Sequence, residues 1–218
     1  MTKLHENFGI SGPLHNWLKS YLSNRFQYTV INGIKSKKQS VSVGIPQGSV
    51  LEPTLFALYT SNLPSSVPSG ETYMFADDTT IYCLADNGDQ GIHQLNKALK
   101  ELYSWSLNNR LTPHPRKSKV MLLSKTNTVG PTPPFIIGGC LVKQANKSRP
   151  LSVTVDDRLT WSPHLSEVTK SFTNKLNLLR KSKFLPKSVL EQFYFSVILP
   201  SITYTLGQTA ATLSYLGR

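Results

Sequence analysis

The segment that decides the fold reads ETYMFADDTTIYC and spans residues 71–83. It contains two runs of aromatic and β-branched residues, which favour extended backbone. Between the runs stand Ala76, Asp77 and Asp78, and Asp is a favoured turn residue. The pattern predicts a tight β-hairpin that carries both carboxylates at or beside its tip.

The two neighbouring carboxylates repel each other. Two unit charges about 4 Å apart repel by about 4 kcal/mol at an effective dielectric near 20. Water, a proton, a basic group or a metal ion has to relieve this repulsion, and Mg²⁺ is often held by one or two carboxylates together with substrate phosphates. Asp77 and Asp78 therefore form either a solvated turn or a magnesium site.

A glycine-rich loop precedes this segment by one predicted helix. It reads GIPQGSVL and spans residues 44–51. Its glycines permit close approach of the backbone to a ligand, and Gln47 offers amide donors and a carbonyl acceptor. The loop is thus either a ligand-binding loop or an ordinary connection.

The spacing of apolar and turn residues predicts the remaining elements. We expect helices over residues 13–22, from Leu51 to a stop at Pro64, from a cap at Asp86 or Asn87 to Asn108, from Ser162, and after Pro186. We expect a hairpin over residues 26–43 with a basic tip at Lys35, Lys37 and Lys38, strands at residues 119–123, 135–137, 141–142 and 151–155, and a linker at residues 130–134. Strands with interspersed helices, followed by helices alone, indicate an α+β fold.

The charge of the chain favours a polyanionic partner. The 218 residues include 24 Lys and Arg and 12 Asp and Glu, a net charge of +12, and nucleic acid is the simplest partner for such a balance. Basic and acidic side chains number six and two before residue 61, three and six over residues 61–115, and fifteen and four thereafter. An acidic segment between basic flanks fits a cation site within a nucleic-acid-binding surface, although solvated faces give the same pattern. Trp17, Trp105 and Trp161 adjoin apolar helical positions, so we expect them in the core rather than stacked on bases.

The cysteines and the apolar segments indicate the compartment. Cys83 and Cys140 form neither a disulfide framework nor a metal-ligand spacing, which is typical of reduced structural thiols. The N-terminus lacks the apolar segment of a signal peptide. The uncharged residues 192–217 are too polar for a membrane helix. We expect an intracellular protein, nuclear or cytoplasmic, that is neither secreted nor inserted in a membrane.

The two motifs together resemble a known family. GIPQGSVL resembles motif B of reverse transcriptases, specifically of the non-LTR (LINE-type) retrotransposon group, and FADDT at residues 75–79 resembles its catalytic motif C. Lys117 within PRKSKVM resembles motif D, and LSVTVD at residues 151–156 resembles the strand near the primer grip. The likeness runs over nearly the whole chain.

The resemblance implies RNA-templated DNA synthesis by two-metal catalysis. Its cofactor would be Mg²⁺ (or Mn²⁺), and its partners an RNA template, a DNA primer and deoxynucleoside triphosphates. The implied catalytic residues are Asp77, Asp78 and Lys117, the first two as metal ligands and the third as a proton donor near the triphosphate. The implied nucleotide- and template-binding residues are Pro46, Gln47, Gly48, Phe75 and Ala76. Lys117 is equally well read as a surface charge.

The resemblance also implies an architecture. Residues 1–158 would form part of the fingers and of a right-hand polymerase palm, an antiparallel sheet with packed helices. Residues 159–218 would form a helical segment resembling a thumb.

One feature of the family pattern is missing. The family carries a further metal-binding Asp in motif A, upstream of the region where this chain begins, and none of Asp86, Asp89, Asp156 and Asp157 stands in that context. A preceding segment or a partner chain would have to supply it, so we expect the chain to be inactive alone. The alternatives are a non-catalytic nucleic-acid-binding remnant, held to phosphates by its basic residues, and an unstable fragment.

Overall fold

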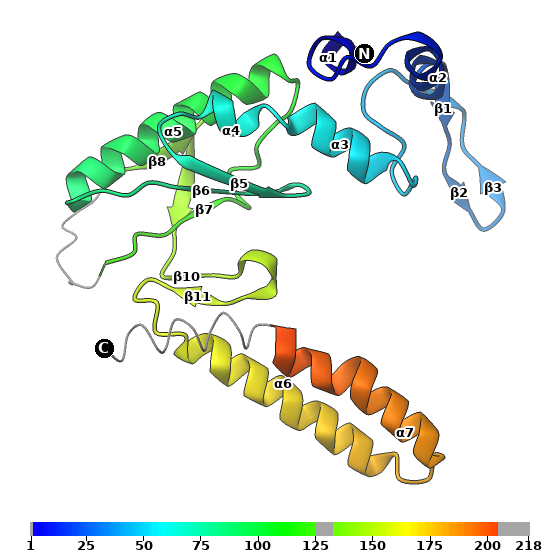
Figure 1. Cartoon of the computed structure of the whole chain (residues 1–218), viewed down its shortest axis with the longest axis vertical. Helices are drawn as coiled ribbons and strands as arrows, with labels where there is room; N and C mark the ends of the chain where they lie inside the picture. Colours follow the sequence, from blue (N-terminus) through cyan, green and yellow to red (C-terminus); the bar gives the residue numbers. More distant parts are fainter. Residues whose placement is uncertain (1, 125–132, 205–218) are drawn as a thin grey trace. The chain divides into compact units, whose positions relative to one another are not determined.

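The computed structural model describes residues 2–124 and 133–204, so residues 130–132 of the expected linker and residues 205–217 of the uncharged stretch lie outside it. The chain mixes α-helices with small β-sheets and divides into two compact units, Met1–Leu111 and Thr112–Arg218. Figure 1 shows both units, which are described in turn.

The first unit begins with two helices and a ribbon of short strands. Helices α1 (Thr2–Glu6) and α2 (Gly12–Leu22) precede strands β1 (Arg25–Gln27), β2 (Val30–Ile31), β3 (Ile34–Lys35) and β4 (Gln39–Val41). Strand β1 pairs with β4 and β2 pairs with β3, both antiparallel, so residues 25–41 form one ribbon.

The ribbon corrects one prediction. Its tip is the turn Asn32-Gly33, whose φ angles of 50° and 82° suit these two residues. The basic side chains therefore do not form the tip: Lys35 lies in β3, and Lys37 and Lys38 lie between β3 and β4.

Two further helices follow the glycine-rich loop. Helix α3 (Glu52–Thr60) joins the first two helices through a cluster of Leu4, Leu18 and Leu55. Pro64 was expected to stop this helix, but it lies in the first turn of a separate short helix, α4 (Leu63–Ser66). Proline suits a first turn because its missing N–H would have no partner there.

The predicted hairpin with the two acids is confirmed. Strands β5 (Glu71–Phe75) and β6 (Asp78–Tyr82) pair in antiparallel register from Glu71↔Tyr82 to Phe75↔Asp78. They precede the long helix α5 (Gly88–Asn108), whose first turn is capped by Asn87, its Oδ1 accepting from the Gln90 N–H at 2.9 Å.

The hairpin and α5 share a core. Leu63, Val67, Ala98 and Trp105 are buried, and Met74, Ile81 and Cys83 pack against them from the hairpin side. Trp105 is thus in the core as expected. Trp17 is not: it is 53% exposed and stacks on Tyr21 with ring centroids 5.7 Å apart.

A glycine permits the close packing at the base of the hairpin. A Cβ added at Gly70 would lie 2.8 Å from the Ile81 Cγ2, 3.2 Å from the Cys83 Sγ and 3.3 Å from the Tyr82 carbonyl oxygen. The first distance is far below van der Waals contact. The start of β5 can therefore approach the end of β6 only without a side chain at position 70.

The second unit contains two small sheets. Strands β7 (Lys119–Val120), β9 (Cys140–Gln144) and β8 (Phe135–Ile137) form one sheet in that order, with β7 parallel and β8 antiparallel to β9. Strand β10 (Lys147–Ser148) pairs with β11 (Val155–Asp156) in the other. The strand expected over residues 119–123 is therefore shorter than predicted.

The strand expected over residues 151–155 is largely wrong. Residues Pro150–Ser152 form a 3-10 turn (η1), and only Val155 of the expected range lies in β11. Leu151 and Ser152 adopt positive φ angles of 46° and 67°, which are incompatible with extended backbone.

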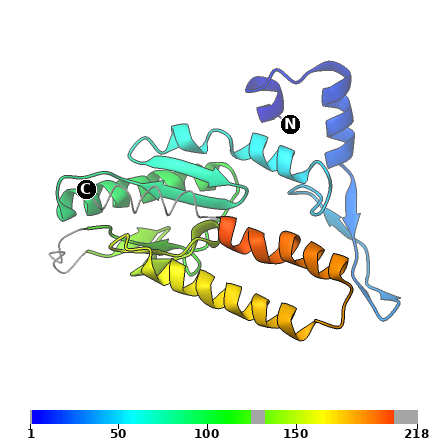
Figure 2. The ribbon, with the colours of Figure 1, turned by 60° about the horizontal axis from the view of Figure 1, so that its bottom comes forward.

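Two helices follow, as predicted. They are α6 (Ser162–Lys181) and α7 (Lys187–Phe193), the latter continued by a π-helical turn at Tyr194–Ile198 (η2). They lie side by side in Figures 1 and 2. Trp161, directly before α6, is half-buried and not fully in the core. Within residues 2–124 and 133–204, the structure contains no helix with the length and apolar character needed to cross a bilayer.

A buried carboxylate organises the start of α6. Asp156 accepts hydrogen bonds from the Thr160 N–H at 3.0 Å, the Thr160 hydroxyl at 2.9 Å and the Trp161 N–H at 3.2 Å. Burial alone would raise the pKa of the Asp156 carboxyl, but these hydrogen bonds outweigh it and hold the pKa below its ordinary value. The aspartate thus serves a structural purpose at this junction.

We predict that Gly70→Ala destabilises the protein by about 1–3 kcal/mol, the usual range for forced overpacking. Gly88→Ala is the matched control, because a Cβ there meets nothing within 4 Å and alanine is the better helix former. Urea unfolding of both variants measures the difference. Equal stabilities for the two variants would contradict the role given to Gly70.

Candidate active site

The hairpin of β5 and β6 presents both acids to solvent. Asp77 lies in the two-residue turn, and Asp78 is the first residue of β6, opposite Phe75. Both side chains are exposed. Within the described ranges, neither carboxylate takes part in a hydrogen bond or ion pair, so both are available to a ligand.

The residue directly before the two acids has an unfavourable backbone conformation. Ala76 adopts a φ of 52°, a left-handed conformation that costs a residue with a Cβ roughly 1–2 kcal/mol. The two-residue turn between β5 and β6 requires a positive φ at this position. Ala76 and the exposed Phe75 thus hold the two acids on a constrained turn.

The base of the hairpin is fixed to α5 by one carboxylate. Glu101 accepts from the Ser69 N–H at 3.0 Å and from the Ser69 hydroxyl at 2.7 Å. The Cys83 thiol donates to the Ser69 carbonyl oxygen at 3.4 Å. Ser69, the residue before Gly70, thus connects the start of the hairpin to α5 and to Cys83 at the end of the hairpin. The sequence analysis did not identify Glu101. The only hint in the sequence is that this acid lies between the apolar residues Leu99 and Leu102 of the predicted helix.

The glycine-rich loop is anchored at both ends. Ile45 and Leu51 pack against the cluster of Leu4, Leu18 and Leu55. The Arg25 guanidinium donates to the Gly44 carbonyl oxygen, and the Gly48 N–H donates to the Glu52 carboxylate. Gly44 and Gly48 have φ angles of 83° and 76°, which favour glycine at both positions.

Between these anchors the loop displays polar groups. Gln47 is exposed and Pro46 is half-buried, and the Gln47 side chain forms no hydrogen bond with any residue in the described part of the chain. The Ser49 hydroxyl is buried and likewise has no partner there. No direct contact joins Gln47 to Asp77 or Asp78 within the described residues, so their expected meeting around a nucleotide stays a prediction.

A lysine links the first helix to the rest of the unit. The Lys3 Nζ donates to the Tyr59 carbonyl oxygen at 2.8 Å and to the Asn62 Oδ1 at 3.0 Å, and it lies 4.7 Å from the Tyr59 ring centroid. Asn62 also accepts from the Trp105 Nε1 at 3.2 Å. Partial burial lowers the pKa of Lys3. This network fixes α1 and α3 against the helix that supports the hairpin.

Lys117 belongs to the second unit. It is exposed, and its N–H closes a turn by donating to the His114 carbonyl oxygen at 3.0 Å. Its predicted position near the triphosphate stays a prediction.

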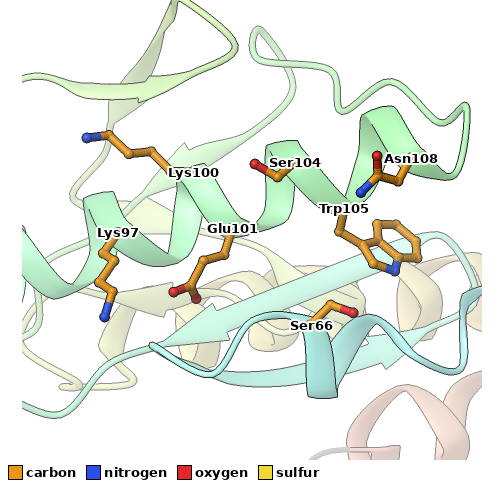
Figure 3. Close-up of a pocket in the computed structure, with 7 residues that line it drawn as sticks. All are labelled: Ser66, Lys97, Lys100, Glu101, Ser104, Trp105 and Asn108. Carbon is orange, nitrogen blue, oxygen red and sulfur yellow. The ribbon is translucent and has the colours of Figure 1, made fainter.

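A groove on α4 and α5 contains none of the predicted site residues. Its volume is about 440 Å³, and its lining residues are Ser66, Lys97, Lys100, Glu101, Ser104, Trp105 and Asn108. Figure 3 shows the Lys97 and Lys100 side chains pointing in different directions from the helix. The groove thus adjoins the clamp at Glu101, and the acids lie elsewhere on the unit.

The acids are a pair and not part of a larger cluster. Over residues 2–124 and 133–204, no group of three or more His, Cys, Asp and Glu side chains is arranged to hold a metal ion. The site therefore consists of two exposed carboxylates on a clamped hairpin and a separately anchored loop with an exposed amide.

Comparison with known proteins assigns this arrangement to a family. The family model described as reverse transcriptase (RNA-dependent DNA polymerase) matches residues 2–155, more than half of the chain. The chain belongs to this family, and its relatives place it among the non-LTR retrotransposon type. No solved structure gives a significant match.

The chain is similar to RNA-directed DNA polymerases of Drosophila mobile elements, two of them from Drosophila melanogaster. The chain is 26% identical over 200 residues to the RNA-directed DNA polymerase from mobile element jockey, covering 87% of this chain and 22% of that protein. It is 29% identical over 208 residues to the probable RNA-directed DNA polymerase from transposon X-element, covering 89% of this chain and 22% of that protein. The chain thus spans about a fifth of the length of these relatives.

We predict that Cys83 reacts slowly with iodoacetamide and that Glu101 contributes to this. Burial, and secondarily the negative charge of Glu101, raise the pKa of the Cys83 thiol above its ordinary value. The reactive thiolate is therefore scarcer at pH 8 in the folded protein. In a Cys140→Ser background, the folded protein should react at least severalfold more slowly than the urea-unfolded protein.

The Glu101→Gln variant provides the second arm of this experiment. Removing the charge should move the rate profile of Cys83 toward lower pH, and urea unfolding of the same variant reports the loss of the clamp. Identical profiles for the folded protein, the unfolded protein and the variant would contradict the geometry.

Proposed function

We propose that this chain is the part of an RNA-directed DNA polymerase that carries the catalytic acids, and that it acts in nucleotidyl transfer onto a DNA primer. One observation carries the proposal: in a chain of the reverse transcriptase family, two exposed and unpaired carboxylates stand at the tip of a hairpin whose base is fixed to α5 by the hydrogen bonds between Glu101 and Ser69.

Asp77 and Asp78 would hold Mg²⁺ (or Mn²⁺). Their chemistry fits, because both are hard oxygen donors without a competing cation within the described residues, and Mg²⁺ commonly keeps one or two carboxylates plus substrate phosphates. When bound, the divalent ions would stabilise the attacking and leaving oxygens of the phosphoryl transfer. The protein's contribution is to hold the two acids at a fixed spacing.

The anchored loop would bind the incoming nucleotide and the template. Pro46 and Gly48 would form its wall, and Gln47 would supply the hydrogen-bonding amide. Phe75 and Ala76 would line the same pocket from the hairpin. Lys117 would lie near the triphosphate as a proton donor to the leaving group. The exposed Gln47 amide supports this assignment, because it offers free donors and a free acceptor within the described part of the chain.

The proposed architecture is a right-hand polymerase. Residues 1–158 would provide part of the fingers and the palm, and residues 159–218 a thumb-like segment. The antiparallel hairpin with its packed helix α5 supports the first part, and the basic helical pair supports the second. The partners would be the RNA template, the DNA primer and deoxynucleoside triphosphates.

A third carboxylate would come from outside these residues, from a preceding segment or from a partner chain. Two acids compensate less charge than two divalent ions require, and electrostatic preorganisation is commonly the largest catalytic contribution. We therefore expect the isolated chain to show little or no synthesis. Processive synthesis by the isolated chain with Mg²⁺ would overturn this part of the proposal.

The direct test is a chimera in which this chain replaces the matching region of the jockey polymerase. We predict that the chimera extends a primer on an RNA template, and that Asp77→Asn lowers the rate at least ~10²–10³-fold, the loss typical of removing one electrostatic contact to the transition state. Primer extension with Mg²⁺ measures the rate.

Asp89→Asn is the matched control for this substitution, since it removes the same charge from the first turn of α5. It should leave the rate nearly unchanged. Loss of synthesis in both variants, or in neither, would contradict the assignment. Absence of synthesis by the unsubstituted chimera, with RNA binding retained, would favour the non-catalytic remnant.

A further inference from the structure

We propose that the ribbon of residues 25–41 binds single-stranded nucleic acid, with bases against its exposed apolar side chains and phosphates against its lysines. The inference rests on the proposed function, because a polymerase of this kind must hold a single strand. It concerns a different element from the acids and the glycine-rich loop. Figure 2 shows the ribbon extending from α2 as paired strands.

The first argument is charge. Residues 7–51 contain no Asp or Glu and five basic residues, namely Lys19, Arg25, Lys35, Lys37 and Lys38. Ordinary solvated surfaces mix both signs. Lys35, Lys37 and Lys38 are exposed, and none forms an ion pair within the described residues. Three uncompensated cations on one short ribbon suit a chain of phosphates.

The second argument is exposed apolar surface. No residue between positions 25 and 41 is buried. The exposed fractions reach 64% for Phe26, 67% for Ile31 and 77% for Ile34, and Tyr28 and Val30 are also exposed. So many exposed large apolar side chains on one short element mark an interaction site. The ribbon therefore presents a surface that a partner has to cover.

The third argument is that an aromatic ring and a cation lie together on the ribbon. Thr29 and Ser36 continue the ladder between the strand pairs, through the Thr29 N–H donating to the Ser36 Oγ and the Ser36 N–H donating to the Thr29 carbonyl oxygen, both at 2.9 Å. Val30 stands opposite Lys35, whose Nζ lies 5.5 Å from the Tyr28 ring centroid.

Aromatic rings beside cations are the combination that binds single strands. Bases stack on the rings regardless of sequence, while the basic groove follows the backbone. A duplex hides the faces of its bases, so it could use only the lysines. A second copy of this chain would bring an equally basic ribbon and be repelled. Charge and aromatic content together thus favour a single-stranded nucleic acid as the occupant.

The test is binding of a labelled single-stranded RNA to the full chain, followed by fluorescence anisotropy in EDTA without nucleotides. The triple variant Lys35→Gln, Lys37→Gln, Lys38→Gln should lose at least tenfold in affinity at moderate salt. The slope of log K against log salt should fall by about 2, since each phosphate contact contributes about 0.7 for single strands. Tyr28→Ala should lose roughly tenfold, the usual effect of removing one stacking ring, with little change in slope.

The matched control removes the same charge elsewhere. Lys97→Gln, Lys100→Gln and Arg110→Gln together take away the three basic residues of positions 61–115 and should change affinity less than twofold. Equal losses in the two triple variants would overturn the proposal, because net charge alone would then explain the binding. Unchanged binding by Tyr28→Ala, or duplex RNA binding as tightly as the single strand, would also overturn it.

Two further arms identify the occupant. A DNA strand of the same sequence distinguishes an RNA template, which binds more tightly than DNA, from any single strand, which binds equally. Sedimentation of the wild type and of Ile31→Ser, Ile34→Ser tests self-association: a dimer that these substitutions dissolve would overturn the proposal. All variants change exposed side chains, so thermal unfolding should be unchanged. Binding in EDTA does not involve Asp77, so failure here is distinguishable from failure of the proposed polymerase function.

Discussion

The arrangement at Ser69, Gly70 and Glu101 is the constraint on which the candidate site depends. A two-stranded hairpin is marginally stable by itself, and its tip must also hold Ala76 in a strained conformation. Glu101 supplies two charge-assisted hydrogen bonds to Ser69, and the missing side chain at Gly70 lets the strand ends approach. Met74 and Ile81 then bury one face of the hairpin against α5. The contacts that hold the hairpin thus lie at its base and on one face, and the carboxylates at its tip stay exposed.

The glycine-rich loop follows the same design on a different core. Apolar residues at its ends pack on the cluster around Leu55, and Arg25 and Glu52 bond its backbone. The residues between these anchors keep their polar groups free. The hairpin and the loop thus each have a base fixed by packing and hydrogen bonds and an exposed segment that carries the candidate site residues. Supporting contacts of this kind hold functional side chains in place.

The sequence pattern predicted those elements that depend on neighbouring residues alone. Two β-prone runs around Asp77 and Asp78 were enough for the hairpin, because its strands pair across a two-residue turn, and Asn87 was recognisable as the cap of α5. The tip of the ribbon was misplaced because the turn preference of Asn32-Gly33 was given too little weight. Residues 151–155 alternate like a strand, but Pro150 and the positive φ of Leu151 impose a turn.

Contacts between distant residues were beyond a reading of patterns. Glu101 is separated from Ser69 by 32 positions, and Lys3 from Asn62 by 59, so no local spacing reveals either pair. Trp17 follows the same apolar spacing as Trp105, yet only Trp105 is buried in a core cluster. The candidate site residues were all proposed from their motifs and stay predictions, whereas the residues that support the hairpin required the structure.

The most direct test of the account is paramagnetic broadening of amide NMR signals by Mn²⁺, because the central claim is that Asp77 and Asp78 bind a divalent ion within reach of the Gln47 loop. The account predicts that the signals of the β5–β6 turn broaden first, that the Gln47 side-chain amide broadens with them, and that Asp77→Asn removes both effects. Broadening that begins elsewhere, or that spares Gln47 while the turn responds, would contradict it.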